Sequence, residues 1–136
     1  MEANLKTLRI YFRTLIRNLV FVFIGCILFL LRRHYSGPLA DIIHSYAGNF
    51  FVSFALYFVF INPLVQFQLK AKRVLAAFLT LAVVESFEAF NGFGYMLNTY
   101  DPIDYIANAL GVGFAFGLDT LLNRKSTLAL NSKSSS

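Results

Sequence analysis

Residues 100–119, YDPIDYIANALGVGFAFGLD, decide the fold class, because this stretch is apolar enough to enter a lipid bilayer and yet carries three carboxylates. The rest of the chain has the same bias. Of its 136 residues 57% are hydrophobic, 16 are Phe and only 14% are charged, whereas charged residues make up about a quarter of an ordinary soluble domain. The composition predicts a single all-α domain, a polytopic integral membrane protein.

Four apolar segments are long enough to be considered as membrane spans, at residues 15–33, 39–67, 74–91 and 102–123. In the first, only 14 residues separate Arg17 from Arg32. That is about 21 Å of helix against roughly 30 Å of hydrocarbon, so either the flanking arginines extend to the headgroups or the bilayer becomes thinner around the helix. A cleaved signal peptide is the competing interpretation, but Arg32 and Arg33 directly after the apolar stretch disfavour it.

The other spans differ in quality. The second follows the breaker Ser36-Gly37-Pro38 and should kink or end near Pro63, and the third reaches spanning length only if it includes Glu85. We expect a small bundle of four transmembrane helices over residues 1–125. The polar segment 126–136 is expected to be a disordered tail.

Basic residues predict the orientation of this bundle. With four crossings, ten Lys and Arg residues lie on one side and two on the other, and the positive-inside rule places the larger group in the cytoplasm. Both termini are then cytoplasmic. Four of the ten precede the uninterrupted apolar run of the first span and share one face of a basic amphipathic helix, which either lies on an anionic inner leaflet or only fixes the orientation: Lys6, Arg9, Arg13 and Arg17.

The last span has a polar stripe. At 100° per residue, six positions fall within a face narrower than about 90°: Asp101, Asp104, Asn108, Gly111, Ala115 and Asp119. A ridge of small residues, Ala109, Gly113 and Gly117, repeats every four positions on the same helix. Together the small residues predict close packing against another helix, in the chain or in a partner: Ala109, Gly111, Gly113 and Gly117.

Helix capping accounts for some of the acids but not for all of them. Asp101 before Pro102 is a favourable N-cap, and Asp104 lies in the first turn, where the helix dipole favours negative charge. Capping does not explain Asn108, nor Glu85, which lies at the same depth if the last two helices are antiparallel. Acids inside a membrane are costly enough that a functional or pairing role is the default expectation.

We therefore predict an outward-facing polar cluster that binds a ligand: Asp41, His44, Asn49, Glu85, Glu88, Asp104 and Asn108. The alternative is a hydrogen-bonded plug with a purely structural role. Asp119 is expected to stand apart, in an ion pair at the inner boundary near Asn123 and Arg124.

Glu85 followed by Asp101-x-x-Asp104-x-x-x-Asn108-x-x-Gly111 resembles the VanZ-like membrane proteins, which pair an acid near the end of one span with a D-x-x-x-N-x-x-G stretch opening the next. The resemblance covers about residues 38–120. The family also has an Asp and a His that open an earlier span, as Asp41 and His44 do here. The chain departs from the family at Glu88, where the family often has Gln, and in the loop before Asp101, which lacks the family's basic residue. In the family, one more residue separates the Asp from the His. The resemblance implies a bacterial inner-membrane protein, linked to glycopeptide antibiotic sensitivity.

Other chemistry is sparse. Cys26 is single, and no nucleotide, metalloprotease or nucleophile-elbow motif occurs, so no catalytic residue, metal or cofactor is predicted, nor any contact with nucleic acid. We expect a non-enzymatic envelope protein that binds a lipid-linked or headgroup ligand, a membrane partner protein or a second copy of itself. A small oligomeric proton-coupled transporter and a metal-assisted membrane hydrolase are the alternatives.

Overall fold

The computed structural model describes residues 2–67, 71–90 and 101–134, and every regular element within them is a helix. The helices are α1 (Glu2–Leu31), the short 3-10 helix η1 (Arg32–His34), α2 (Ala40–Gln66), α3 (Lys72–Ala89) and α4 (Pro102–Ser134). The predicted all-α class is confirmed. Residue 91 of the predicted third span and residues 135–136 of the predicted tail lie outside the described residues.

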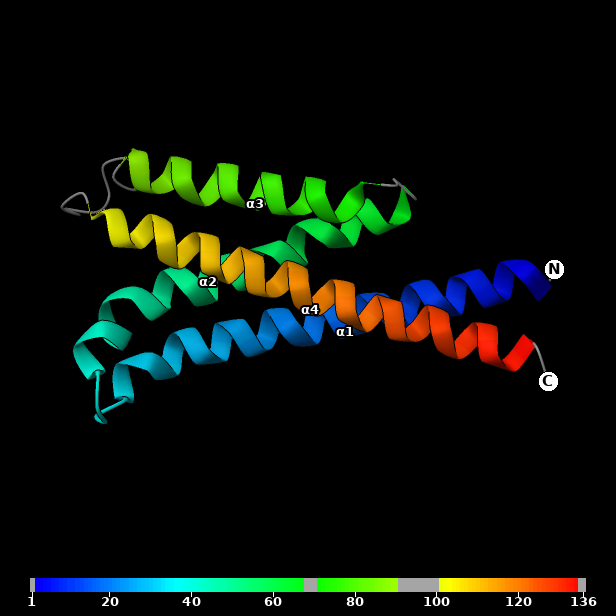
Figure 1. The fold of residues 1–136 in the computed structure, drawn as a ribbon, viewed down its shortest axis with the longest axis horizontal. Helices are drawn as coiled ribbons and strands as arrows, with labels where there is room; N and C mark the ends of the chain where they lie inside the picture. The colour runs from blue at the N-terminus through cyan, green and yellow to red at the C-terminus, as the bar shows by residue number, and fades with distance from the viewer. Residues whose placement is uncertain (1, 68–70, 91–100, 135–136) are drawn as a thin grey trace.

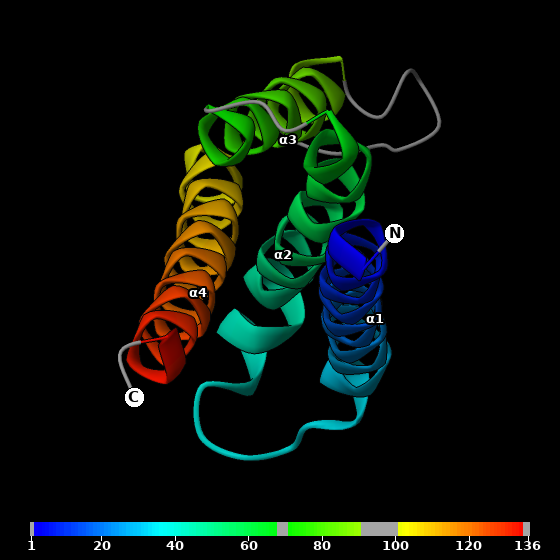
Figure 2. The same ribbon diagram turned by 90° about the vertical axis from the view of Figure 1, so that its right-hand side faces the viewer.

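α2 is the central helix of the bundle. It packs against α1, α3 and α4, and α3 also packs against α4. In the described part of the chain α1 makes no close backbone contact with α4, because α2 lies between them (Figure 2). Figure 1 shows the beginning of α1, the end of α2, the beginning of α3 and the last turns of α4 at one end of the bundle. We refer to this as the terminal end.

Three helical segments are long and apolar enough to cross a membrane, Thr7–His34, Ala40–Gln66 and Pro102–Arg124. Their outer surfaces are apolar as well: on α1 the side chains of Phe23 and Leu30 are 66% and 65% exposed. Soluble proteins rarely expose apolar surface so extensively, so these faces suit contact with lipid. The predicted span 74–91 forms α3, which is not one of the three; it has 18 residues, among them Glu85 and Glu88.

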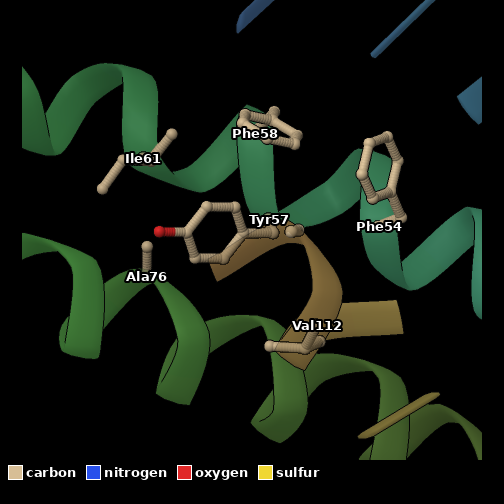
Figure 3. Close-up of a cluster of buried hydrophobic side chains, with 7 residues drawn as sticks. Phe54, Tyr57, Phe58, Ile61, Ala76 and Val112 are labelled. Carbon is tan, nitrogen blue, oxygen red and sulfur yellow. The ribbon is translucent and has the colours of Figure 1, made fainter. Parts of the chain in front are cut away.

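The apolar core lies where α2 meets α3 and α4 (Figure 3). Tyr57 and Phe58 of α2 are fully buried, and Ala76 of α3 and Val112 of α4 complete the cluster. Phe21 of α1 stacks on Phe58 with ring centroids 4.7 Å apart, which attaches α1 to the other side of α2. Because lipid is as apolar as these side chains, close van der Waals packing stabilises such a core.

One glycine allows α2 and α4 to come together. A Cβ atom at Gly111 would overlap the carbonyl oxygen of Phe50, so only a residue without a side chain fits this crossing. At Gly113 and Gly117 a Cβ would meet nothing within 4 Å, and Ala109 is exposed. Of the four small residues expected to pack against a helix, Gly111 therefore does so within the chain. Ala109, Gly113 and Gly117 face away from the other described helices.

The structure shows where two of the predicted helices end. α4 continues to Ser134, although residues 126–136 were expected to be disordered. The segment Leu128-Ala129-Leu130 consists of strong helix formers and no Gly or Pro interrupts it, so nothing in it ends the helix. α2 passes through Pro63 and ends three residues later, at Gln66.

Candidate functional site

A polar cluster lies between α2, α3 and α4 at the end of the bundle opposite the terminal end. We call it the Asp104 cluster: Asn49, Ser53, Glu85, Asp104 and Asn108. Asn49 Nδ2 donates a hydrogen bond to Asp104 Oδ1 (2.6 Å), and Ser53 Oγ donates one to Asn108 Oδ1 (2.7 Å). Asp104 and Asn108 are 7% and 2% exposed. Of the predicted site residues, the structure brings Asn49, Glu85, Asp104 and Asn108 together.

Two buried atoms of this cluster, Asn108 Nδ2 and Glu85 Oε2, form no regular hydrogen bond within the described residues. Their side chains face each other closely enough to interact. A buried polar atom that lacks a partner costs roughly 1–3 kcal/mol, so such atoms are rare in folded proteins. An amide nitrogen carries two N–H donors and a carboxyl group has two oxygens, so the cluster keeps donor and acceptor capacity for a further polar group even when these two side chains interact.

The other predicted site residues lie elsewhere. Asp41 is exposed in the first turn of α2. His44 is also exposed, and its Nε2 lies 2.8 Å from the carbonyl oxygen of Tyr35, so it holds the turn before α2 and does not enter the cluster. Glu88 lies one turn beyond Glu85 on α3 and is half-buried.

Asp101 behaves as the capping pattern predicts. Its Oδ1 accepts a hydrogen bond from the backbone N–H of Ile103 (2.9 Å), as expected of an N-cap. Its Oδ2 accepts a second from the Tyr46 hydroxyl (2.8 Å), which ties the beginning of α4 to α2. The role of Asp101 is therefore structural.

A second polar cluster, near the terminal end, involves all four long helices. We call it the Asp119 cluster: Arg17, Asn18, Tyr57, Asn62, Arg73, Asp119 and Asn123. Arg17 Nη2 lies 2.5 Å from Asp119 Oδ1, and Arg73 Nε lies 3.0 Å from Asp119 Oδ2. Asn123 Nδ2 donates to Oδ1 (2.7 Å) and the Tyr57 hydroxyl to Oδ2 (3.4 Å). Asp119 is only 2% exposed.

This arrangement corrects the expectation for Asp119. The carboxylate forms an ion pair as expected, but its partners are Arg17 and Arg73 on other helices, and Arg124 is exposed. The signal was present in the sequence. Arg17 ends the basic part of the first helix and Arg73 begins the third, so both lie at the depth of Asp119 in an antiparallel bundle. From the sequence, the charges of Arg17 and Arg73 were assigned to membrane orientation alone, and their pairing with Asp119 was not predicted.

Further amides extend the Asp119 cluster. Asn18 is completely buried; its Oδ1 accepts hydrogen bonds from Arg17 (2.8 Å to Nη2), and its Nδ2 donates to Asn62 Oδ1 of α2 (2.8 Å). The amide thus holds the Arg17 guanidinium in position. Neither asparagine was singled out from the sequence, because each is a single polar residue in an apolar run.

A cavity of about 440 Å³ opens beside the Asp119 cluster. Its walls come from the first half of α1, the end of α2, the beginning of α3 and the later part of α4. Three of the lining residues carry a charge, namely Lys72, Arg73 and Asp119, and two are amides, Gln66 and Asn123. The volume falls within the roughly 300–1,000 Å³ range of small-molecule sites.

The described residues contain no group of three or more His, Cys, Asp or Glu side chains that could hold a metal ion. Compared with known proteins, the chain matches no family model, no curated protein and no solved structure. The resemblance to the VanZ-like family therefore stays an expectation from the sequence motif.

Proposed function

We propose that this chain is a non-enzymatic, VanZ-like protein of the bacterial inner membrane, whose Asp104 cluster binds the polar headgroup of a lipid or lipid-linked ligand from the outer leaflet. The observation that carries the proposal is the pair of buried polar atoms, Asn108 Nδ2 and Glu85 Oε2, which form no regular hydrogen bond within the described residues. When an apolar helix bundle contains few polar or ionisable side chains, those side chains are by default candidates for a functional site.

The chemistry of the cluster favours a headgroup rich in hydroxyl groups. A hydroxyl donates and accepts at once, so one such group would satisfy both the Asn108 amide and the Glu85 carboxyl oxygen. The carboxylates of Glu85 and Asp104 would repel a phosphate placed among them. A sugar or glycerol headgroup therefore fits the cluster better than an anionic one.

The ligand would reach the cluster from outside if the chain crosses the membrane four times with cytoplasmic termini. Two contacts support a crossing by α3. Arg73 meets Asp119, and Glu85 interacts with Asn108, so twelve residues of α3 run antiparallel to eleven of α4, about 16–18 Å of common length. The ten-to-two distribution of basic residues supports the same topology.

The test of this function is binding of a neutral glycolipid, diglucosyl diacylglycerol, to the full chain in phosphatidylcholine nanodiscs. We expect Glu85→Gln and Asp104→Asn to abolish binding while the protein stays folded, since each amide keeps the side-chain size but loses the carboxylate. Asp41→Asn is the matched control, an exposed acid on the same end of the bundle, and should bind normally. Cells carrying the two amide variants should also lose any effect of this protein on lipoglycopeptide sensitivity.

A purely structural plug makes the opposite prediction. Without a ligand, Glu85→Gln and Asp104→Asn would leave every phenotype unchanged or would stabilise the bundle, because they remove the cost of a buried charge. An equal loss of glycolipid binding in Asp41→Asn would mean that the site is elsewhere. A proton-coupled transporter would instead show flux in proteoliposomes that Glu85→Gln stops.

A further inference from the structure

The cavity at the terminal end combines a charged wall with an apolar one. Its charged wall consists of Lys72 and Arg73 from α3 with Asp119 from α4, and its apolar wall includes Leu8, Ile61 and Val65. Hydroxyl groups of Thr14 and Tyr11 also line it. The Tyr11 hydroxyl accepts a hydrogen bond from Gln66, so its own proton is left to donate.

The charge balance of the cavity is positive. Asp119 is the only acid among its lining residues, and Arg17 and Arg73 both bind that carboxylate. One guanidinium would be enough to neutralise it. Lys72 adds a further positive charge and forms no ion pair within the described residues. Arg73 uses Nε for Asp119, and its two Nη nitrogens form no hydrogen bond within those residues.

The beginning of α3 strengthens this field. Its N-cap residue is Ala71, which provides no side-chain hydrogen bond, and its first turn contains no acid. Among the described residues, neither a capping side chain nor an acid of the first turn therefore offsets the free N–H groups and the positive end of the helix dipole. Lys72 and Arg73, which begin this helix, both line the cavity.

We propose that this cavity binds the phosphate headgroup of an anionic phospholipid, with Lys72 and Arg73 at the phosphate and Leu8, Ile61 and Val65 beside the glycerol and first acyl carbons. The apolar wall favours a lipid over free phosphate. The cavity faces the side of the membrane that carries the termini, which is the cytoplasmic leaflet in the topology proposed above; the binding itself does not depend on the function of the Asp104 cluster.

The test compares the full-length protein in nanodiscs of phosphatidylcholine alone with nanodiscs that contain added phosphatidylglycerol, and counts the retained lipids by native mass spectrometry. We expect wild type to retain phosphatidylglycerol selectively. Lys72→Gln should weaken that retention about tenfold or more, as expected for the loss of a charge-assisted hydrogen bond worth about 1.5–3 kcal/mol. This variant should fold normally, because Lys72 pairs with no acid in the described chain.

Arg13→Gln is the matched control, since Arg13 is an exposed basic residue of α1 that does not line the cavity. An equal effect of Arg13→Gln and Lys72→Gln would overturn the proposal in favour of diffuse attraction to the membrane surface. Val65→Phe, which narrows the cavity without changing its charge, should also reduce retention, and normal retention in that variant would exclude the cavity as the site. Displacement of the lipid by millimolar inorganic phosphate would show that a free anion is the ligand.

The proposals for the Asp104 cluster and for the cavity at the terminal end can be tested independently. Glu85→Gln removes a carboxylate from the opposite end of the bundle and should leave phosphatidylglycerol retention unchanged. Lys72→Gln should leave binding of the neutral glycolipid unchanged.

Discussion

Arg17 and Asp119 are 102 residues apart in the sequence, and their side chains lie 2.5 Å apart, between two helices whose backbones make no close contact in the described chain. Figure 2 shows α2 between α1 and α4, so the contact between these two helices is made by the long side chain of Arg17. Since Arg73 reaches the same carboxylate from α3, Asp119 connects three helices, and the hydroxyl of Tyr57 adds the fourth.

Asp119→Leu should destabilise the bundle by about 3 kcal/mol or more, because two arginines would lose their common buried partner. Thermal or denaturant unfolding in detergent, followed by circular dichroism, measures the change. Arg124→Gln, an exposed basic residue nearby, should have no comparable effect. If Asp119→Leu were as stable as wild type, the cluster would have no structural role.

Ser53→Ala should cost about 1–3 kcal/mol, since it removes the hydroxyl that donates to the buried Oδ1 of Asn108. Ser45→Ala, at an exposed position of the same helix, is the control and should be neutral. The double variant Ser53→Ala/Asn108→Leu should recover part of the loss, because the buried amide oxygen that Ser53→Ala leaves without its donor is then absent. No difference between Ser53→Ala and Ser45→Ala in unfolding experiments would contradict this account.

Gly111→Ala should destabilise the chain by about 1–3 kcal/mol, because the added methyl group overlaps the carbonyl oxygen of Phe50 where α2 and α4 cross. Gly113→Ala adds the same group into open space and should be neutral or stabilise α4 by about 0.5–1 kcal/mol. The pair separates crowding from helix propensity. Equal effects at both positions would show that the close crossing is not what requires Gly111.

Cysteine labelling in a Cys26→Ala background measures the topology. With four spans, Asn98→Cys reacts from outside and Ser132→Cys reacts only after permeabilisation. If α3 does not cross, the chain crosses three times and the two sites exchange sides. The reverse labelling pattern would therefore contradict the prediction of four spans with a cytoplasmic C-terminus.

The sequence was sufficient for the all-α class, for three of the helices that could cross a membrane, and for the convergence of Asn49, Glu85, Asp104 and Asn108. These follow from hydropathy and from helical periodicity, which place residues by depth and by face. Periodicity does not describe how the chain turns between helices, so it could not show that His44 turns back to Tyr35. Nor does it describe the reach of a long side chain, which is why the pairing of Arg17 with Asp119 was missed.

The Asp119 cluster also has a consequence for the order in which the protein can be assembled. Asp119 is synthesised 46 residues after Arg73 and 102 residues after Arg17. Until α4 arrives, both guanidinium groups lack their carboxylate, and a charged side chain without a partner stays hydrated at the membrane surface. The final positions of Arg17 and Arg73 therefore depend on α4, and a chain that stops before α4 presents two arginines that the finished protein pairs with one carboxylate.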